Sequence, residues 1–433
     1  MLTMKKIAFV LAFVLLALGG GYYLLRHENH AEIAYKTPGE ADPYVRFVME
    51  GYDSILQNYW EDPKNYDLGN ILKLSIEKAS GGTYALASST RDSVSEMVAA
   101  AMQAATTTEA KKNLAVNTLI VAAYNLQPPG RSGLLSAAQE TELRQNVSNI
   151  NPAKDLYQDL GLEKGASVSD VQLAYAKKEK ELKASTTPAA KAELDQVAYA
   201  KKVLTNADSK ALYDQNQIEP TVWSRTLGDT LYLYISKISP ATLFEFGKAI
   251  DNASTTKNLD SMILDVRGNV GGDLAFAQNF LGLFTGQNQY AFDLFHQGDY
   301  QVQRTVQPRY PLLDRYGEIA ILTDNMTQST AEVISAMMKR MHLAKLVGTN
   351  TRGWGTVENT YPLTTEIDPK TKYTLFLVNS ITLRDDNQPI EGRGVDPDVN
   401  TGDSKWKANL LNVFQSASLI KALKDTASST PLK

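Results

Sequence analysis

The sequence contains no cysteine among its 433 residues, and this absence removes several classes of protein. Disulfide bonds, thiolate zinc sites, iron–sulfur clusters and a cysteine nucleophile are all excluded. Histidine is scarce too, because the chain has only 4. No two of them have the spacing of a metal-binding pair: His27, His30, His296 and His342. The sequence therefore predicts no metal site and no bound cofactor.

An excess of basic charge is also missing. Lys and Arg number 44 and Asp and Glu 48, which gives a formal net charge of −4. A chain without a basic surplus has little with which to neutralise phosphates, so we expect no nucleic-acid partner. The hydrophobic content of 43% and charged content of 21% are typical of globular domains. A chain of this length has room for roughly two to four domains.

One long apolar run stands near the N-terminus, at residues 7–25, directly after Lys5 and Lys6. Its length is close to that needed to cross a bilayer, and the lysines favour a cytoplasmic N-terminus. A cleaved secretory signal is the alternative, although no clear small-x-small cleavage site follows. Residues 1–31 are thus predicted to be a single-pass membrane anchor or a signal, with the rest of the chain extracytoplasmic.

Helical patterns dominate the first half of the chain. In residues 32–150, apolar side chains recur every three to four positions, as in Val45, Val48 and Tyr52. We predict helices from about residue 43, and at 68–79, 93–105, 110–124 and 136–147. Residues 151–217 are charged and helix-rich, with predicted helices at 168–182, 189–205 and 208–215.

From about residue 218 the sequence alternates between strands and helices. Predicted strands lie at 231–235, 262–266, 319–322, 345–347 and 373–383, and predicted helices at 240–253, 273–284 and 329–342. This order favours a sheet covered by helices, so residues 218–403 are predicted to form an α/β core. Residues 404–433 are predicted to form one helix, 406–423, followed by a disordered end. The fold class is therefore α+β or α/β, in several domains.

Two glycines follow a buried strand in the segment Asp265 to Gly272. Glycines at the start of a helix let backbone N–H groups approach a ligand, and a helix N-terminus favours negative charge. An oxyanion hole requires both properties. Any tight turn between a strand and a helix could use glycines as well.

A serine occupies the start of the next strand–helix unit. Ser329 comes shortly after the strand 319–322, and Glu332 stands three residues later. The pattern is that of a helix N-cap with its capping box. A nucleophile on a strand-to-helix turn has the same pattern. A third segment, the glycine-spaced residues 348–357, is either a plain connection or a loop of the same site.

In this order the three segments resemble the C-terminal processing (tail-specific) serine peptidases, over about residues 227–399. A closing segment, Ile390 to Asp398, resembles that family as well. The resemblance implies a ClpP/crotonase-like core and unfolded or peptide substrates. It implies Ser329 as nucleophile, with an oxyanion hole formed by the N–H groups of Thr330 and of either Gly271 or Gly272.

The catalytic base of that family is absent. The family lysine stands 25 residues after the serine, and here that position is Trp354. An indole N–H is a donor only and cannot take a proton from serine. The family glutamine four residues later is Glu358, a possible substitute base. Two interpretations stay open: a serine peptidase with another base, and an inactive relative that binds peptides or proteins as an adaptor.

Residues 151–217 resemble a DnaJ-type J domain in the spacing of segments such as 155–157 and 212–214. The His-Pro-Asp loop of J domains is missing, and residues 184–189 read ASTTPA instead. A J-like module without that loop is predicted to dock a protein partner or to act as a spacer. It stands where this peptidase family commonly carries a PDZ domain.

Overall fold

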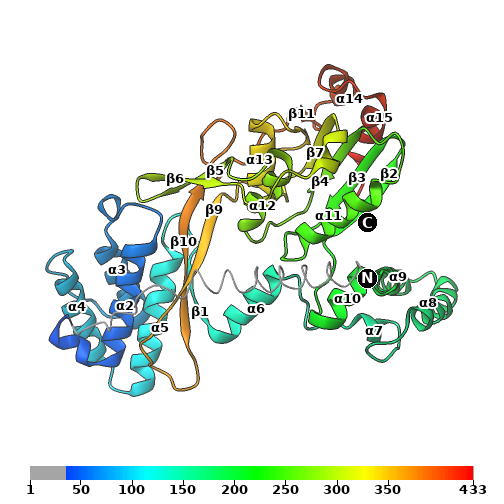
Figure 1. Ribbon diagram of the computed structural model, residues 1–433. Coiled ribbons are helices and arrows are strands. Elements are labelled where there is room, and N and C mark those ends of the chain that lie inside the picture. Colours follow the sequence, from blue (N-terminus) through cyan, green and yellow to red (C-terminus); the bar gives the residue numbers. More distant parts are fainter. Residues whose placement is uncertain (1–35, 433) are drawn as a thin grey trace.

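Residues 36–432 are described in a computed structural model of the chain (Figure 1). The predicted membrane segment, residues 7–25, lies outside this range. Across residues 36–432, no helix combines the length and apolar character needed to cross a bilayer.

The N-terminal region folds as predicted into amphipathic helices. Asp42 caps the first long helix by accepting from the N–H of Tyr44, with Pro43 in the first turn. The helices are α2 (Pro43–Asn58), α3 (Leu68–Ser80), α4 (Arg91–Ala104), α5 (Thr108–Tyr124) and α6 (Ala137–Val147), with short 3₁₀ turns η1 (Pro38–Ala41) and η2 (Pro63–Asn65).

These helices pack on a sheet whose strands come mostly from far along the chain (Figure 1). The sheet has the order β1-β10-β5-β6, and β9 also pairs with β10. Its strands are β1 (Gly133–Ser136), β5 (Tyr290–His296), β6 (Asp299–Arg304), β9 (Thr356–Pro362) and β10 (Tyr373–Thr382). Of these, the sequence predicted only β10. One apolar cluster contains buried side chains of the helices α2, α3, α4 and α5 together with buried side chains of β10, such as Leu375 and Leu377.

The predicted α/β core contains a second, six-stranded sheet in the order β11-β8-β7-β4-β3-β2. All neighbours are parallel except β2 and β3. Its strands are β2 (Val222–Leu227), β3 (Thr230–Ile235), β4 (Ser261–Asp265), β7 (Glu318–Thr323), β8 (Lys345–Gly348) and β11 (Val399–Asn400). The helices α11 (Thr242–Ala253), α12 (Ala275–Thr285) and α13 (Thr330–Arg340) and the turn η3 (Pro311–Arg315) accompany it.

Side chains alternate between the two faces of this sheet. Leu231, Leu233 and Ile235 of β3 pack in the cluster with α11 to α13, whereas Tyr232 and Tyr234 pack on the opposite face. This is the period of two expected of a strand. The sheet is therefore buried on both sides, as parallel sheets usually are.

Residues 151–217 form a helical module that contacts the edge strand β2 of this sheet, where the ring of Tyr199 lies 6.0 Å from that of Trp223. Its helices are α7 (Leu156–Asp159), α8 (Val168–Lys183), α9 (Pro188–Thr205) and α10 (Ala207–Asn216). Buried residues of the module, such as Tyr157 and Val197, belong to the same apolar cluster as Tyr232. Where the chain enters and leaves the module, Ile150 and Ile218 form an antiparallel bridge. The likeness to a J domain stays a prediction.

The predicted C-terminal structure was wrong in two respects. The predicted helix 406–423 is broken into α14 (Trp406–Asn409), a 3₁₀ turn η4 (Leu410–Asn412) and α15 (Ala417–Thr426). The break separates two short apolar surfaces that both pack on the sheet. The end of the chain is ordered as far as residue 432, because Arg267 donates to the carbonyls of Ala427 and Ser429 at 3.0 and 2.7 Å.

Candidate active site

Ser329 lies at the N-terminus of α13 in an unusual backbone conformation, φ 53° and ψ −127°. A residue with a β carbon rarely adopts positive φ, and an ordinary N-cap residue has an extended backbone. Its N–H donates to Glu332 Oε2 at 2.9 Å, which is the backbone half of a capping box. Strained backbone of this kind is typical of functional sites. The N-cap interpretation alone therefore does not account for Ser329.

The glycine turn after β4 packs directly against Ser329. A β carbon placed on Gly271 would lie 2.6 Å from Ser329 Cβ and 3.0 Å from the backbone nitrogen of Thr330. A β carbon on Gly272 would lie 1.9 Å from the carbonyl oxygen of Ile238. Both glycines also have positive φ, 84° and 154°. Only glycine fits these two positions, because any side chain would collide with neighbouring backbone.

The same turn shows which N–H groups are available to a ligand. The N–H of Gly271 is already used, since it donates to Asn269 Oδ1 at 2.8 Å. Within residues 36–432, neither Gly272 nor Thr330 donates a hydrogen bond from its N–H. The hydroxyl of Thr330 donates to the carbonyl of Gly272 at 2.8 Å, which links the two segments. Of the two glycines predicted for the oxyanion hole, the geometry favours Gly272.

Glu332 joins the serine segment to the loop after β8. This carboxylate is fully buried and accepts from the N–H groups of Ser329, Gly353 and Trp354, and from the hydroxyl of Thr351. Burial raises the pKa of Glu332, and these hydrogen bonds oppose the shift. Ser329 and Trp354 share one oxygen, Oε2, at 2.9 and 2.8 Å. The backbone N–H groups of the predicted nucleophile and of the residue at the family lysine position therefore lie close together, on one carboxylate oxygen.

The side chain of Trp354 is fixed by charged groups. Its indole Nε1 donates to Glu358 Oε1 at 3.4 Å, and Thr356 Oγ1 donates to the same oxygen at 2.5 Å. The guanidinium of Arg131 lies over the indole ring, 3.3 Å from its centroid. Burial raises the pKa of Glu358, while Thr356, Trp354 and the charge of Arg131 act in the opposite direction. None of these four side chains is a lysine, so they form no serine–lysine pair with Ser329.

Two predicted motif residues have a structural role instead. Asp265 is fully buried and accepts from Arg267 Nε and Nη2 at 2.9 and 2.5 Å, and from the hydroxyl of Tyr232 at 2.5 Å. Arg267 in turn holds the C-terminal segment. This part of the glycine-turn motif therefore fixes the turn and the tail rather than contacting a substrate.

Apolar side chains are exposed on both turns that meet at Ser329. Val270 is 48% exposed beside Gly271, and Met326 is 46% exposed three residues before Ser329. An arrangement with a strained serine, two available N–H groups and an apolar border could bind a polypeptide and attack its carbonyl carbon.

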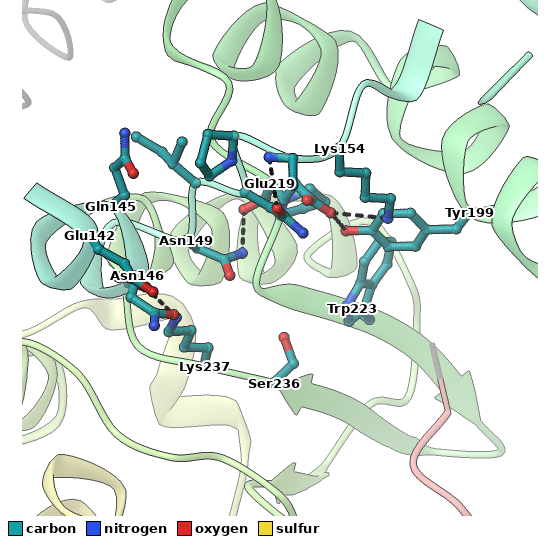
Figure 2. A pocket seen from close by; sticks show the side chains of 15 residues that line it. Glu142, Gln145, Asn146, Asn149, Lys154, Tyr199, Glu219, Trp223, Ser236 and Lys237 are labelled. Carbon is teal, nitrogen blue, oxygen red and sulfur yellow. Dashed lines mark hydrogen bonds and ion pairs between the residues drawn. The ribbon is translucent and has the colours of Figure 1, made fainter. Parts of the chain in front are cut away.

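A large open cavity lies elsewhere, at the base of the helical module (Figure 2). It measures about 770 Å³ and is bordered by the end of α6, the two connections of the module and the loop after β3. Figure 2 shows Lys237 reaching towards Asn146, whose backbone carbonyl and Oδ1 accept from its ammonium group. Ser329 does not line this cavity. The cavity belongs to the joint between module and core.

Part of the chain is similar to known proteins. Residues 229–401 match the model of peptidase family S41. The core of this chain is therefore similar to peptidases of family S41. The match covers the glycine turn, Ser329 and the loop that contains Trp354, and it leaves out the N-terminal helices and residues 151–217.

Curated relatives of the S41 core are carboxy-terminal processing proteases. The chain is 28% identical to the carboxy-terminal processing protease CtpB of Bacillus subtilis over 136 residues, 30% of this chain and 27% of that protein. It is 28% identical to a probable CtpA-like serine protease of Staphylococcus epidermidis over 187 residues, 43% of this chain and 36% of that protein. The matched region thus spans about a third or less of these relatives.

Among solved structures, the photosystem II D1 C-terminal processing protease aligns over 82% of this chain and 92% of its own. Sequence identity is 12% and the TM-score is 0.48.

Sequence reasoning missed two residues of this site. Arg131 belongs to the segment before β1, and Glu391 belongs to the closing motif, yet neither was predicted to contact the Trp354 loop. Glu391 pairs with Arg131 at 3.0 Å and accepts from the N–H of Gly355 at 2.8 Å. No local pattern could reveal a contact between segments 260 residues apart.

Proposed function

We propose that this chain is a membrane-anchored, extracytoplasmic serine peptidase of the C-terminal processing type, with Ser329 as its nucleophile. The observation that carries the proposal is the strained turn at Ser329, which packs against Gly271 beside the available N–H groups of Gly272 and Thr330. Anchoring through residues 7–25 is supported by their apolar sequence alone.

In this function the hydroxyl oxygen of Ser329 attacks the carbonyl carbon of a peptide bond. The N–H groups of Gly272 and Thr330 stabilise the negative charge that develops on the carbonyl oxygen. The hydroxyl proton must pass to a base, and Trp354 cannot accept it. We assign Glu358 as the candidate base, because its carboxylate accepts from the indole of Trp354, whose backbone N–H shares Glu332 Oε2 with that of Ser329. Burial also raises the pKa of Glu358. Substrates are unfolded segments with apolar side chains, which Val270 and Met326 can contact.

A second candidate function is a binding adaptor that cleaves nothing. The contacts of Trp354 favour it, because the indole donates to Glu358 while Arg131 covers its face. In that case the fixed aromatic side chain of Trp354 occupies the position of the family base. Such a protein would retain the peptide groove, and residues 151–217 would dock a protein partner.

Cleavage of casein by the full chain tests both functions. We expect the native chain to cleave casein and Ser329→Ala to be inactive. In the same series, Glu358→Gln should lower kcat by about 10² or more, as expected when a general base is removed. The matched control is Glu140→Gln, a glutamate on α6 whose side chain is 20% exposed and pairs with Arg144.

Three outcomes separate the candidates. Cleavage that survives Ser329→Ala would contradict the peptidase proposal. Cleavage that needs Ser329 but not Glu358 would retain the nucleophile and reject the base. A native chain that binds casein without cleaving it would support the adaptor.

A further inference from the structure

We propose that Arg131 is a positioning residue of the Ser329 site, by which the N-terminal helical region holds Trp354 in place. The proposal rests on the proposed function only in placing the site at Ser329. It applies whether the site cleaves or only binds polypeptides.

Arg131 contacts the Trp354 loop in two ways. Its guanidinium stacks on the indole at 3.3 Å from the ring centroid, and its Nη2 pairs with Glu391 Oε1 at 3.0 Å. The side chains of Arg131 and Glu391 are only 16% and 17% exposed. A planar guanidinium can stack and pair at the same time, which an ammonium group cannot do as well. The contact is therefore specific for arginine.

Glu391 extends this contact to the backbone of the loop. Its second oxygen accepts from the N–H of Gly355 at 2.8 Å. The N–H of the preceding residue, Trp354, donates to Glu332, which also accepts from the N–H of Ser329. Two carboxylates thus fix successive residues of the loop, one from the serine helix and one paired with Arg131. Loss of the arginine would leave Glu391 largely buried without its cation.

The segment that carries Arg131 is fixed by the N-terminal helices. The side chains of Tyr59 and Trp60, at the end of α2, both donate to the carbonyl of Gln127. The N–H of Gly130 donates to Tyr124 at the end of α5, and Ser132 accepts from Val378 of β10. The helices therefore set the position of Arg131, and Arg131 sets that of the indole. In this way a region outside the matched S41 core completes the site.

Trp354 itself provides the measurement. We would measure acrylamide quenching of tryptophan fluorescence in the full chain and in each variant. For each protein, the signal of the same protein that also carries Trp354→Phe is subtracted, which leaves the signal of Trp354. In Arg131→Gln the quenching constant of Trp354 should rise about twofold, because a stacked cation no longer covers one face of the ring. Arg131→Lys should restore part of the protection. The control Arg144→Gln, an exposed arginine of α6 that pairs with Glu140, should change nothing.

Labelling of Ser329 by a fluorophosphonate provides the second readout. Its rate should fall about tenfold in Arg131→Gln, because small displacements of site groups have large effects on rate. Unchanged quenching in both Arg131 variants would overturn the proposal. A native chain that does not label would count against the peptidase function, while quenching would still decide the role of Arg131. If Arg131→Gln does not fold, the quenching in Arg131→Lys decides it, and an unchanged value there would reject the proposal.

Discussion

At the scale of single residues, Trp354 is the main departure of the S41-like core from the family pattern. Its side chain rests on the carboxylate of Glu358 and beneath the guanidinium of Arg131. A lysine placed there would meet the same carboxylate. An opposite charge within hydrogen-bond distance favours the protonated amine, which is not a base.

We therefore predict that Trp354→Lys alone gives little gain in activity, whereas adding Trp354→Lys to Glu358→Gln raises the activity of that variant by about 10² or more, the usual contribution of a general base. The rate of casein cleavage measures both, and Ser329→Ala in each background is the control. Equal activity of Glu358→Gln with and without Trp354→Lys would show that a lysine at position 354 does not act as a base even when Glu358 is removed.

At the scale of elements, Glu245 of α11 anchors the return of the chain from the helical module. Its Oε2 accepts from the N–H and hydroxyl of Thr221 at 2.8 and 2.6 Å and from the N–H of Val222 at 3.1 Å. Its other oxygen is buried without a partner among the described residues. Burial raises the pKa of Glu245 to about 7, from an ordinary value of 4.5. Between these two pH values the folded state therefore keeps the proton on Glu245.

This shift predicts a stability that falls as the pH rises. Below pH 4.5 the carboxyl is protonated in both states, so the group makes no difference. Between 4.5 and about 7 only the unfolded state releases the proton, which favours unfolding. Relative to Glu245→Gln, the native chain should lose up to about 3 kcal/mol of unfolding free energy across this window. Urea unfolding at several pH values measures it, and parallel curves for the two proteins would contradict the assignment.

Element prediction succeeded where one local pattern was sufficient. The helices α3, α8 and α9 begin and end within one residue of their predicted bounds, because capping residues and apolar spacing are local. The strands β5, β6 and β9 were missed, because they are partly exposed and mix polar with apolar residues. Their pairing partners lie elsewhere in the chain, and only pairing stabilises them as strands.

At the scale of the whole molecule, the first and last thirds of the chain share one core. Phe47 of α2 is fully buried, and its ring lies 5.5 Å from that of Tyr373 in β10. The helices and the strand therefore stabilise each other. The predicted division at residue 150 separates them in sequence only.

Phe47→Ala should therefore lower the unfolding free energy of the whole molecule by about 3–5 kcal/mol, as for other large truncations in a core. Leu74→Ala, on α3 and 63% exposed, is the matched control and should change it by less than about 0.5 kcal/mol. Circular dichroism and tryptophan fluorescence should report one common transition. An early, separate loss of helical signal in Phe47→Ala would show that the N-terminal helices unfold independently.

The sequence by itself determined the absence of cysteine chemistry, the positions of most helices before residue 404 and the order of the motifs that resemble family S41. These depend on residue identity and on neighbours within a few positions. The tertiary structure decided which N–H groups are available at Ser329, what holds Trp354, and that residues 427–432 pack on the sheet. The physical reason is distance along the chain: Arg131 and Glu391, or Arg267 and Ser429, meet only after folding, and their contacts have no local signature.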